Sequence, residues 1–114
     1  MKETKPIDCS SAIVQVRDAI DVISGKWKIL ILISITHGNK RFTEIQKSVT
    51  KITAKVLSKE LKDLEEHLLI KRTIIDDYPV RIEYSATPYS KTLEGLINEL
   101  YDWGGKHREM IKGK

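Results

Sequence analysis

Apolar residues recur along much of the chain at steps of three and four, the spacing that places side chains on one face of an α-helix. This pattern predicts a first helix that Ser10 or Ser11 can cap, with an apolar stripe formed by Ala12, Val16, Ala19, Ile20 and Ile23. A second helix, from about Lys26, is apolar nearly all round, which predicts an element buried on most sides. Gly38-Asn39 is expected to end it.

The middle of the chain predicts a short helix, a tight turn and a longer helix. Phe42-Thr43 opens the short helix, and Thr43 and Gln46 have the spacing of a capping box. Thr53 is positioned to cap the longer helix, predicted over residues 54–68. The apolar positions of that helix are Ala54, Leu57, Leu61, Leu64 and Leu68, and its wet face carries Lys55, Ser58, Lys59 and Lys62.

Two strand signals and a last helix follow. Residues 70–75 are rich in β-branched side chains and residues 80–86 alternate strictly, so the pair predicts a hairpin. Thr87-Pro88 has the pattern of an N-cap followed by a first helical residue, which opens a long helix over residues 87–112. Gly104-Gly105 is expected to bend or interrupt this helix.

The element order predicts a mainly α fold with a small β-hairpin. A short capped helix, a turn and a longer helix make a helix-turn-helix, here over residues 43–69, and the hairpin over residues 70–86 is its wing. No repeat or linker interrupts the 114 residues, so residues 1–114 are expected to form a single domain, with residues 1–11 as an N-terminal arm.

The excess positive charge is confined to one segment. Between residues 40 and 62 there are seven basic and two acidic side chains, a net charge of +5, whereas the other residues have 13 basic and 14 acidic side chains, or −1. Such a patch is typical of a protein that binds a polyanion. The alternative is a solvated helix face whose lysines aid solubility.

In a winged helix-turn-helix, the longer helix enters the DNA major groove. The charge map agrees with this arrangement, and the candidate DNA contacts are Thr43, Thr53, Lys55, Val56, Ser58, Lys59, Lys62 and Arg81. The lysines suit phosphates, while Arg81 suits a phosphate or the minor groove. Alternatively, the threonines are caps only and Arg81 pairs with Asp76 or Asp77. A rival function is a winged-helix module that binds protein or RNA rather than duplex DNA.

The two terminal helices predict a homodimer. Their apolar stripes would leave exposed patches on a monomer, and pairing across a two-fold axis would bury both. The candidate interface residues are Ile13, Val16, Ile20, Leu93, Leu96, Ile97, Leu100 and Trp103. Such pairing also sets two reading helices about 34 Å apart, one turn of DNA. The alternative is that both helices fold back onto their own core.

Other chemistry has little support in the sequence. The single cysteine excludes an intrachain disulfide, and His37, His67 and His107 have no partner at metal-ligand spacing. Because no phosphate loop or nucleophile motif is present, we expect no enzyme, no cofactor and no metal. The apolar runs are too short for a membrane span and the first residues lack a secretion signal, so a cytoplasmic protein is expected.

Several segments together resemble one known family. These are Gly25-Lys26-Trp27-Lys28, Arg41 to Ile45, Val56 to Leu61 with Leu64-Glu65, Arg81 to Ser85 with Thr87, and Trp103-Gly104. In this order they resemble the HxlR-type winged helix-turn-helix regulators. The resemblance implies a bacterial or archaeal transcription factor that dimerises through its N- and C-terminal helices. Leu68 and Ser90 stand where the family usually has glycine, which puts the junction between the reading helix and the wing in doubt.

The resemblance extends to Cys9, because such proteins often carry an N-terminal cysteine that in some members senses oxidants or electrophiles. Cys9 is expected just before the first helix, where the backbone dipole favours a thiolate and the neighbouring Asp8 opposes it. A redox switch at the dimer interface is one hypothesis, and a small buried thiol without regulatory consequence is the other.

Overall fold

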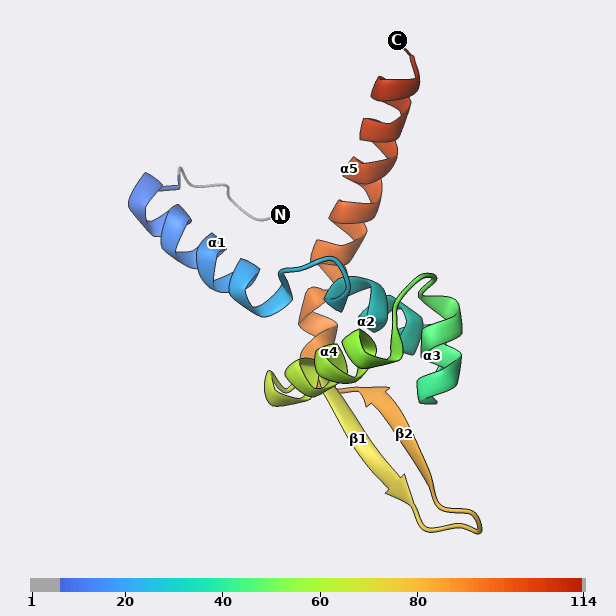
Figure 1. Cartoon of the computed structure of the whole chain (residues 1–114). Coiled ribbons are helices and arrows are strands. Elements are labelled where there is room, and N and C mark those ends of the chain that lie inside the picture. Colours follow the sequence, from blue (N-terminus) through green and yellow to red (C-terminus); the bar gives the residue numbers. More distant parts are fainter. Residues whose placement is uncertain (1–6, 114) are drawn as a thin grey trace.

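The computed structural model describes residues 7–113, and it is mainly helical with a two-stranded antiparallel hairpin (Figure 1). Residues 1–6, which make up much of the expected N-terminal arm, lie outside the described part. The elements in chain order are α1 (Cys9–Ile23), α2 (Lys28–Thr36), α3 (Phe42–Ser48), α4 (Ala54–Glu66), β1 (Ile70–Ile75), β2 (Arg81–Ala86), the 3₁₀-helix η1 (Pro88–Leu93) and α5 (Glu94–Lys112). The predicted fold class is thus confirmed.

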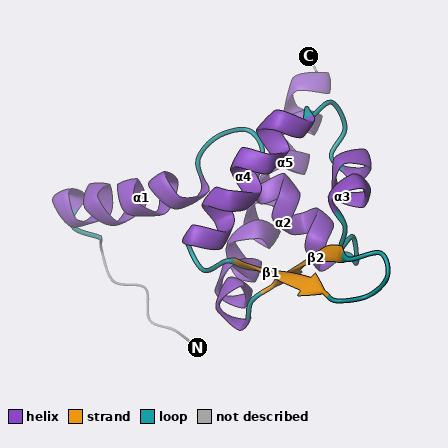
Figure 2. Cartoon of the chain, turned by 60° about the horizontal axis from the view of Figure 1, so that its bottom comes forward, coloured by secondary structure: helices purple, strands orange, loops and turns teal. Residues whose placement is uncertain are grey.

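The core forms where α2, α3 and α4 pack around the root of the hairpin (Figure 2). The buried apolar side chains are Ile31, Leu32, Ile35, Ile45, Val49, Ile52, Leu57, Leu61, Leu64, Leu69 and Ile70. As its sequence predicts, α2 lies at the centre, although Leu30 on its outer side stays 44% exposed. The leucine stripe of α4 therefore points inward, and its opposite face is left to solvent.

The caps of the helix-turn-helix are only partly as predicted. Thr53 accepts a hydrogen bond from the Val56 backbone N–H at 3.2 Å and caps α4, as expected. The expected capping box of Thr43 and Gln46 is wrong, because Thr43 lies inside α3 and cannot cap it. The Glu44 carboxylate instead accepts the backbone N–H groups of Lys40 and Arg41, and these bonds lower the pKa of Glu44.

Helix α4 ends earlier than predicted, at Glu66. Leu68 was expected on the apolar stripe, but it lies beyond the helix with φ 64° and is 68% exposed, while Leu69 is buried. The Leu69 N–H donates to the Leu64 carbonyl at 3.0 Å, so a left-handed residue still terminates the helix. Leu68 thus adopts the left-handed conformation that glycine would adopt at lower cost.

The hairpin, which is the predicted wing, extends away from the core. β1 pairs with β2 from Ile70↔Ala86 at the root to Ile75↔Arg81 near the tip, close to the predicted strand limits. On the other edge of β2, the Tyr84 N–H donates to the Lys40 carbonyl at 2.7 Å. The segment that leads into α3 is thereby fixed beside the wing.

The first helix begins two or three residues before its predicted start. Asp8 is its N-cap and accepts from the Ser11 N–H at 3.2 Å and from the Ser10 hydroxyl at 2.6 Å. These bonds, that of Ser10 most strongly, lower the pKa of Asp8. The expected cap at Ser10 or Ser11 is therefore wrong, because a carboxylate two or three residues earlier already satisfies the first N–H groups. Cys9 is consequently the first residue of α1 and not a residue before it.

The last helix starts as predicted but is built differently. Thr87 caps it and Pro88 is its first residue, yet the first six residues are 3₁₀ and only then does α5 continue to Lys112. The expected interruption at Gly104-Gly105 is wrong, since glycine lowers helix stability by only about 1 kcal/mol. Ser90, the second departure from the family pattern, is buried and donates through Oγ to the Thr87 carbonyl at 2.7 Å.

The terminal helices project away from the core in different directions (Figure 1). Neither α1 nor α5 contains a buried residue. The structure thus differs from the alternative in which both helices fold back onto their own core, although Leu93 at the base of the last helix does pack against it.

We expect Leu68→Gly to stabilise the fold by about 0.5–1 kcal/mol. Glycine removes the Cβ penalty of the left-handed conformation, and this gain exceeds the cost of the higher conformational entropy that glycine gives the unfolded chain. Leu68→Ala, which removes the same exposed side chain but keeps Cβ, is the matched control and should give no such gain. Urea unfolding measures both. Equal stability of the two variants would contradict the strain assigned to Leu68.

Candidate nucleic-acid interface

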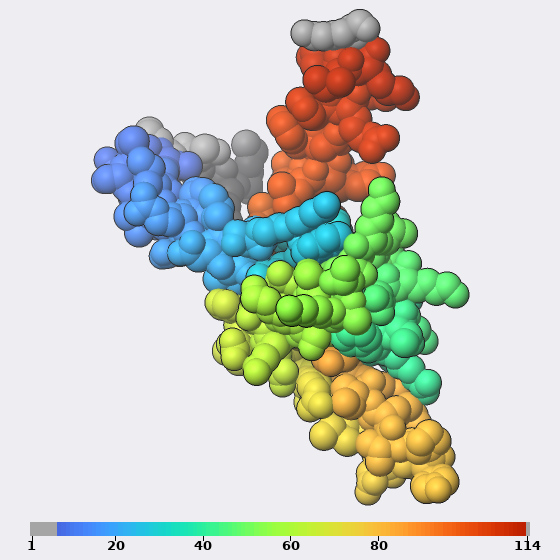
Figure 3. Space-filling model, in the orientation of Figure 1, coloured from blue at the N-terminus to red at the C-terminus, as the bar shows by residue number. Residues whose placement is uncertain are grey.

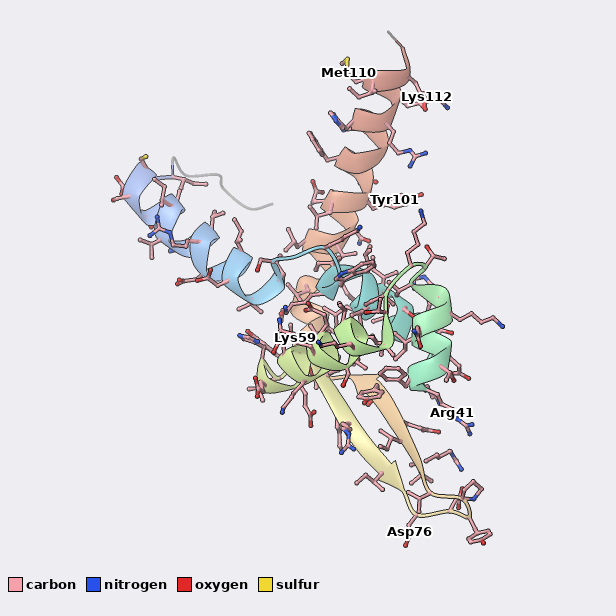
Figure 4. The ribbon with its side chains drawn as sticks, in the orientation of Figure 1. Arg41, Lys59, Asp76, Tyr101, Met110 and Lys112 are labelled. Carbon is pink, nitrogen blue, oxygen red and sulfur yellow. The ribbon has the colours of Figure 1, made fainter. Side chains whose placement is uncertain are left out.

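The most basic surface of α4 is the face opposite its leucines. Lys55, Lys59 and Lys62 are all exposed, and their spacing of four and three residues aligns them along the helix. Figure 3 shows the outer surface of α4 facing the viewer, with α3 to its right and the hairpin below. Lys59 lies on this near side (Figure 4). The structure therefore brings the predicted lysines together on one accessible helix face.

Two acids of the same helix are held from beneath by a lysine of α2. The Lys28 Nζ lies 2.6 Å from Glu60 Oε1 and 3.5 Å from Asp63 Oδ2, and its side chain is only 11% exposed. Burial acts to lower the pKa of Lys28, but the hydrogen bond to Glu60 and the charges of both acids outweigh it, so the net pKa is raised. This role of Lys28 is not predicted from the sequence, where a lysine at the start of an apolar helix is the only signal.

The remaining candidate DNA contacts on the helix-turn-helix differ in their exposure and in whether their side chains already contact other parts of the protein. Ser58 is exposed on the lysine side of α4, and Thr43 is exposed on α3. Thr53 is engaged as a cap, although its hydroxyl proton remains able to donate. Val56 is half-buried and packs against the core, so only part of its side chain can reach a ligand. Lys51, in the turn, adds a further exposed cation at φ 73°.

Arg81 is occupied by acids of the wing. Its Nη1 contacts the Asp77 carboxylate and its Nε lies 3.2 Å from Glu83 Oε2, so one of the predicted alternatives, pairing with Asp77, is observed. The hydrogen bonds to Asp77 and Glu83 raise the pKa of Arg81 further above its ordinary value. Asp76 stands at the same tip (Figure 4), which is therefore acidic. The free cations of the wing are Lys71 and Arg72 on β1, which sequence reasoning did not single out.

The candidate interface residues form exposed apolar stripes on the terminal helices. Ile13, Val16 and Ile20 are each about half exposed, and Cys9 lies on the same helical face, one turn before Ile13. On α5, Leu96, Leu100 and Trp103 are exposed and Ile97 is half-buried. Leu93, the last residue of η1, is half-buried because it packs against the core. Trp103 stacks on His107 with ring centroids 5.0 Å apart.

A wide apolar groove separates α2 from the base of the C-terminal helix. Its volume is about 1140 Å³, and Leu30, Ile33, Ile97 and Leu100 are among its lining residues. The exposed stripe of α5 thus continues onto α2. This surface is large and apolar for a protein of this size.

The described residues contain neither a candidate metal site nor a helix suited to span a membrane. From Ile7 to Gly113, no three side chains of histidine, cysteine, aspartate or glutamate gather as a metal site would require. No helix in this same range has the length and apolar character needed to cross a bilayer.

Comparison with known proteins identifies the family. The model of the HxlR-like helix-turn-helix matches residues 22–112. The chain belongs to this family. The match includes α4 with its lysines, the hairpin and α5. It leaves out most of α1, including Cys9.

The relatives of this HxlR-like chain are transcriptional regulators and not enzymes. The HTH-type regulator YtcD of Bacillus subtilis is 36% identical over 100 residues, which are 88% of this chain and 79% of YtcD. Its crystal structure has a TM-score of 0.78 and covers 82% of this chain and 96% of that one. The redox regulator HypR in its reduced form is 31% identical with a TM-score of 0.80, over 88% of this chain and 99% of HypR.

A third relative also carries a redox description in solved structures. The regulator YodB of Bacillus subtilis is 27% identical over 95 residues, which are 83% of this chain and 85% of YodB. Its reduced form has a TM-score of 0.71 over 78% of this chain and 87% of that one. A diamide-treated form of YodB is similar as well. These likenesses concern a family of regulators to which this chain belongs.

Proposed function

We propose that this HxlR-like regulator binds double-stranded DNA sequence-specifically as a homodimer in the cytoplasm. The observation that carries the proposal is the exposed row of Lys55, Lys59 and Lys62 on a helix whose Glu60 and Asp63 lie within 4 Å of the buried Lys28 of α2. A helix is the element that the major groove of B-DNA admits, and lysines there neutralise phosphates. The hairpin over residues 70–86 serves as the wing.

Within this arrangement the proposed DNA contacts have different weights. Lys55, Lys59 and Lys62 bind phosphates, or guanine acceptors near the start of the helix, and Ser58, Thr43, Thr53 and Val56 supplement them. Arg81 must first release Asp77 and Glu83 to reach DNA, so it contributes less than its position suggests. Lys71 and Arg72 are exposed on β1 and form no ion pair within the described residues of the wing, so they are expected to contribute more to phosphate binding than Arg81 does.

Duplex DNA is favoured over RNA or a protein as the partner. The deep, narrow major groove of A-form RNA does not admit side chains from a helix, whereas that of B-DNA does. A protein partner would favour a contact surface with few lysines, because lysine is depleted at protein interfaces. The basic face of α4 fits neither of these alternatives.

The terminal helices are proposed to form the dimer interface. The stripe of Ile13, Val16 and Ile20 on α1, and that of Leu96, Leu100 and Trp103 on α5, expose apolar area that a monomer would leave in water. Gly104 lies beside the α5 stripe, and a Cβ built there would meet no atom of this chain within 4 Å, so packing within the chain does not require a glycine at this position. The absence of a side chain would let a partner helix approach closely. A two-fold axis would bury both stripes at once.

Cys9 is proposed to make the regulator responsive to oxidants or electrophiles. It is exposed, which argues against the alternative of an inert buried thiol, and it lies on the interface side of α1. HypR and YodB are relatives whose structures are described by redox state. Because the chain has one cysteine, a disulfide within the homodimer can form only between the Cys9 residues of the two copies. Both thiols then lose a proton and an electron to the oxidant, which is reduced.

The DNA proposal is tested with Lys55→Ala/Lys59→Ala. Each lysine that neutralises a phosphate contributes about 0.9 to the slope of log affinity against log salt, so the slope should become shallower by about 1.8. The affinity should fall about tenfold or more at moderate salt. Fluorescence anisotropy with a random-sequence duplex, over a series of salt concentrations, measures both.

Lys106→Ala/Lys112→Ala is the matched control, because it removes the same charge from α5, and Lys112 lies at the far end of that helix (Figure 4). This control should keep the slope of the unmodified protein. If the two double variants bind alike, or if binding has no salt dependence, the DNA proposal is wrong. Tighter binding to an RNA of equal length would favour the rival function.

The dimer proposal is tested with Val16→Asp against Val14→Asp. Both residues are about half exposed on α1, but Val16 lies on the apolar stripe and Val14 on the opposite face. Burial of an unpaired carboxylate in each protomer should raise the dimer dissociation constant about 100-fold or more for Val16→Asp. Sedimentation velocity measures the change. An equal dissociation constant for the two variants would exclude the α1 stripe from the interface.

The redox proposal is tested with diamide, which accepts the two hydrogens released when two thiols join. We expect a covalent dimer on a non-reducing gel and a change in DNA affinity of about threefold or more, because the disulfide alters the spacing of the reading helices. Cys9→Ser should show neither response. If Cys9→Ser still releases DNA on oxidation, the switch does not reside at Cys9.

A further inference from the structure

The proposed contacts with DNA leave one feature of the core unused, the buried lysine of α2. Among residues 7–113, Lys28 is the lysine that the protein buries, with 9% of its surface exposed. Its Nζ lies 2.6 Å from Glu60 Oε1 and 3.5 Å from Asp63 Oδ2. Both acids belong to α4 and are three residues apart, so they lie about one turn from each other on one side of the helix. A single ammonium group therefore contacts both.

The charge of α4 alone does not favour a polyanion. Residues 54–66 contain three lysines and four acids, namely Glu60, Asp63, Glu65 and Glu66, so the helix has a net charge of −1. Glu65 and Glu66 occupy its C-terminal end. Glu60 and Asp63, by contrast, lie beside the lysine row, where free carboxylates would repel phosphates and attract the lysines. Their engagement by Lys28 therefore matters for how the lysines are presented.

Lys59 is the lysine at stake. Its Nζ is 3.9 Å from Asp63 Oδ2, the same oxygen that lies 3.5 Å from the Lys28 Nζ, and the Lys59 side chain is 73% exposed. Figure 4 labels Lys59 on α4. Lys59 and Asp63 are four residues apart, the spacing at which opposite charges pair on a helix. Lys28 is the nearer cation, so it holds Asp63 and leaves Lys59 only loosely engaged.

We propose that Lys28 is a positioning residue for DNA binding, which holds Glu60 and Asp63 toward α2 so that Lys59 is only weakly paired with Asp63 and can exchange it for a phosphate. This inference rests on the proposed function, since it concerns the same helix face. Without Lys28, Asp63 takes Lys59 as its nearest remaining cation, and one phosphate contact is lost. Lys28 itself does not touch the DNA.

The test is the salt dependence of duplex binding by Lys28→Met. Loss of one phosphate contact should make the slope of log affinity against log salt shallower by about 0.9 and should weaken binding about three- to tenfold at moderate salt. Lys26→Met is the matched control, because it removes an equal charge two residues away from an exposed position and frees no acid of α4. It should keep the slope. Fluorescence anisotropy with a random-sequence duplex measures both.

Two further variants separate positioning from mere stability. Lys28→Met/Asp63→Asn should recover the slope, because the amide no longer captures Lys59, and Lys28→Arg should retain it because the guanidinium can bridge both acids. If Lys28→Met does not fold, Glu60→Gln is added, since it removes the unpaired buried carboxylate. That background still leaves Asp63 free, so the shallower slope and its recovery by Asp63→Asn are expected there too.

The outcomes distinguish this inference from the function on which it rests. If the unmodified protein shows no salt-dependent binding to duplex DNA, the proposed function fails and Lys28 has no such role. If the unmodified protein binds but Lys28→Met has the slope of Lys26→Met, the positioning role alone is overturned. A loss of affinity at unchanged slope that Asp63→Asn does not reverse would also overturn it, because Lys28 would then act only on stability.

Discussion

The packing of α4 on α2 decides which side chains this protein presents to its partner. Leu57, Leu61 and Leu64 are essentially fully buried, and each such leucine stabilises the docked helix by about 1.5–3 kcal/mol. A helix turns by about 100° per residue, so burial of these three positions fixes the direction of every other side chain. Lys55 and Lys59 cannot turn inward without exposing the leucines. The basic surface is therefore a consequence of the hydrophobic core.

The same docking brings opposite charges together at the rim of the core. Lys28 approaches α4 at the edge of the leucine stripe, where Glu60 and Asp63 can reach it. A buried ion pair contributes little net stability, because desolvation opposes the Coulomb attraction. Its value here lies in the distribution of charge, since two acids are drawn to the inner flank while the lysines remain outside. Core packing and surface potential are thus coupled through one side chain.

The sequence predicted the parts of the fold that depend on periodicity, and it was wrong where longer-range contacts decide. The helices, the hairpin and the lysine face follow from spacings of two, three and four residues. The spacing of Thr43 and Gln46 predicts a capping box, but Arg41 is the N-cap of α3 and Glu44 accepts its backbone N–H. The neighbouring Lys40 carbonyl accepts from the Tyr84 N–H of the hairpin. The partner of Lys28 lies 32 residues away, and no local pattern indicates such a pairing.

Other differences between the predicted and the observed structure involve a free-energy cost in local backbone conformation that tertiary contacts offset. Leu68 adopts a left-handed conformation because Leu69 must enter the core, and Thr87 Oγ1 also bonds the Leu68 carbonyl at 2.7 Å. Gly104-Gly105 does not break α5, because reduced helix propensity only lowers its stability. The 15-residue α1 has no buried residue and would be marginal as an isolated helix in water. Its persistence in solution therefore depends on what covers its stripe.

Selection of bound sites from a pool of random duplexes tests the central claim most directly. Two reading helices related by a two-fold axis should enrich an inverted repeat whose half-sites are centred about 10 base pairs apart, one turn of DNA. Enrichment of such a repeat would establish duplex recognition and symmetry together. Failure to enrich any sequence, or enrichment of a lone asymmetric site by a monomer, would contradict a dimer that reads DNA with the lysine face of α4.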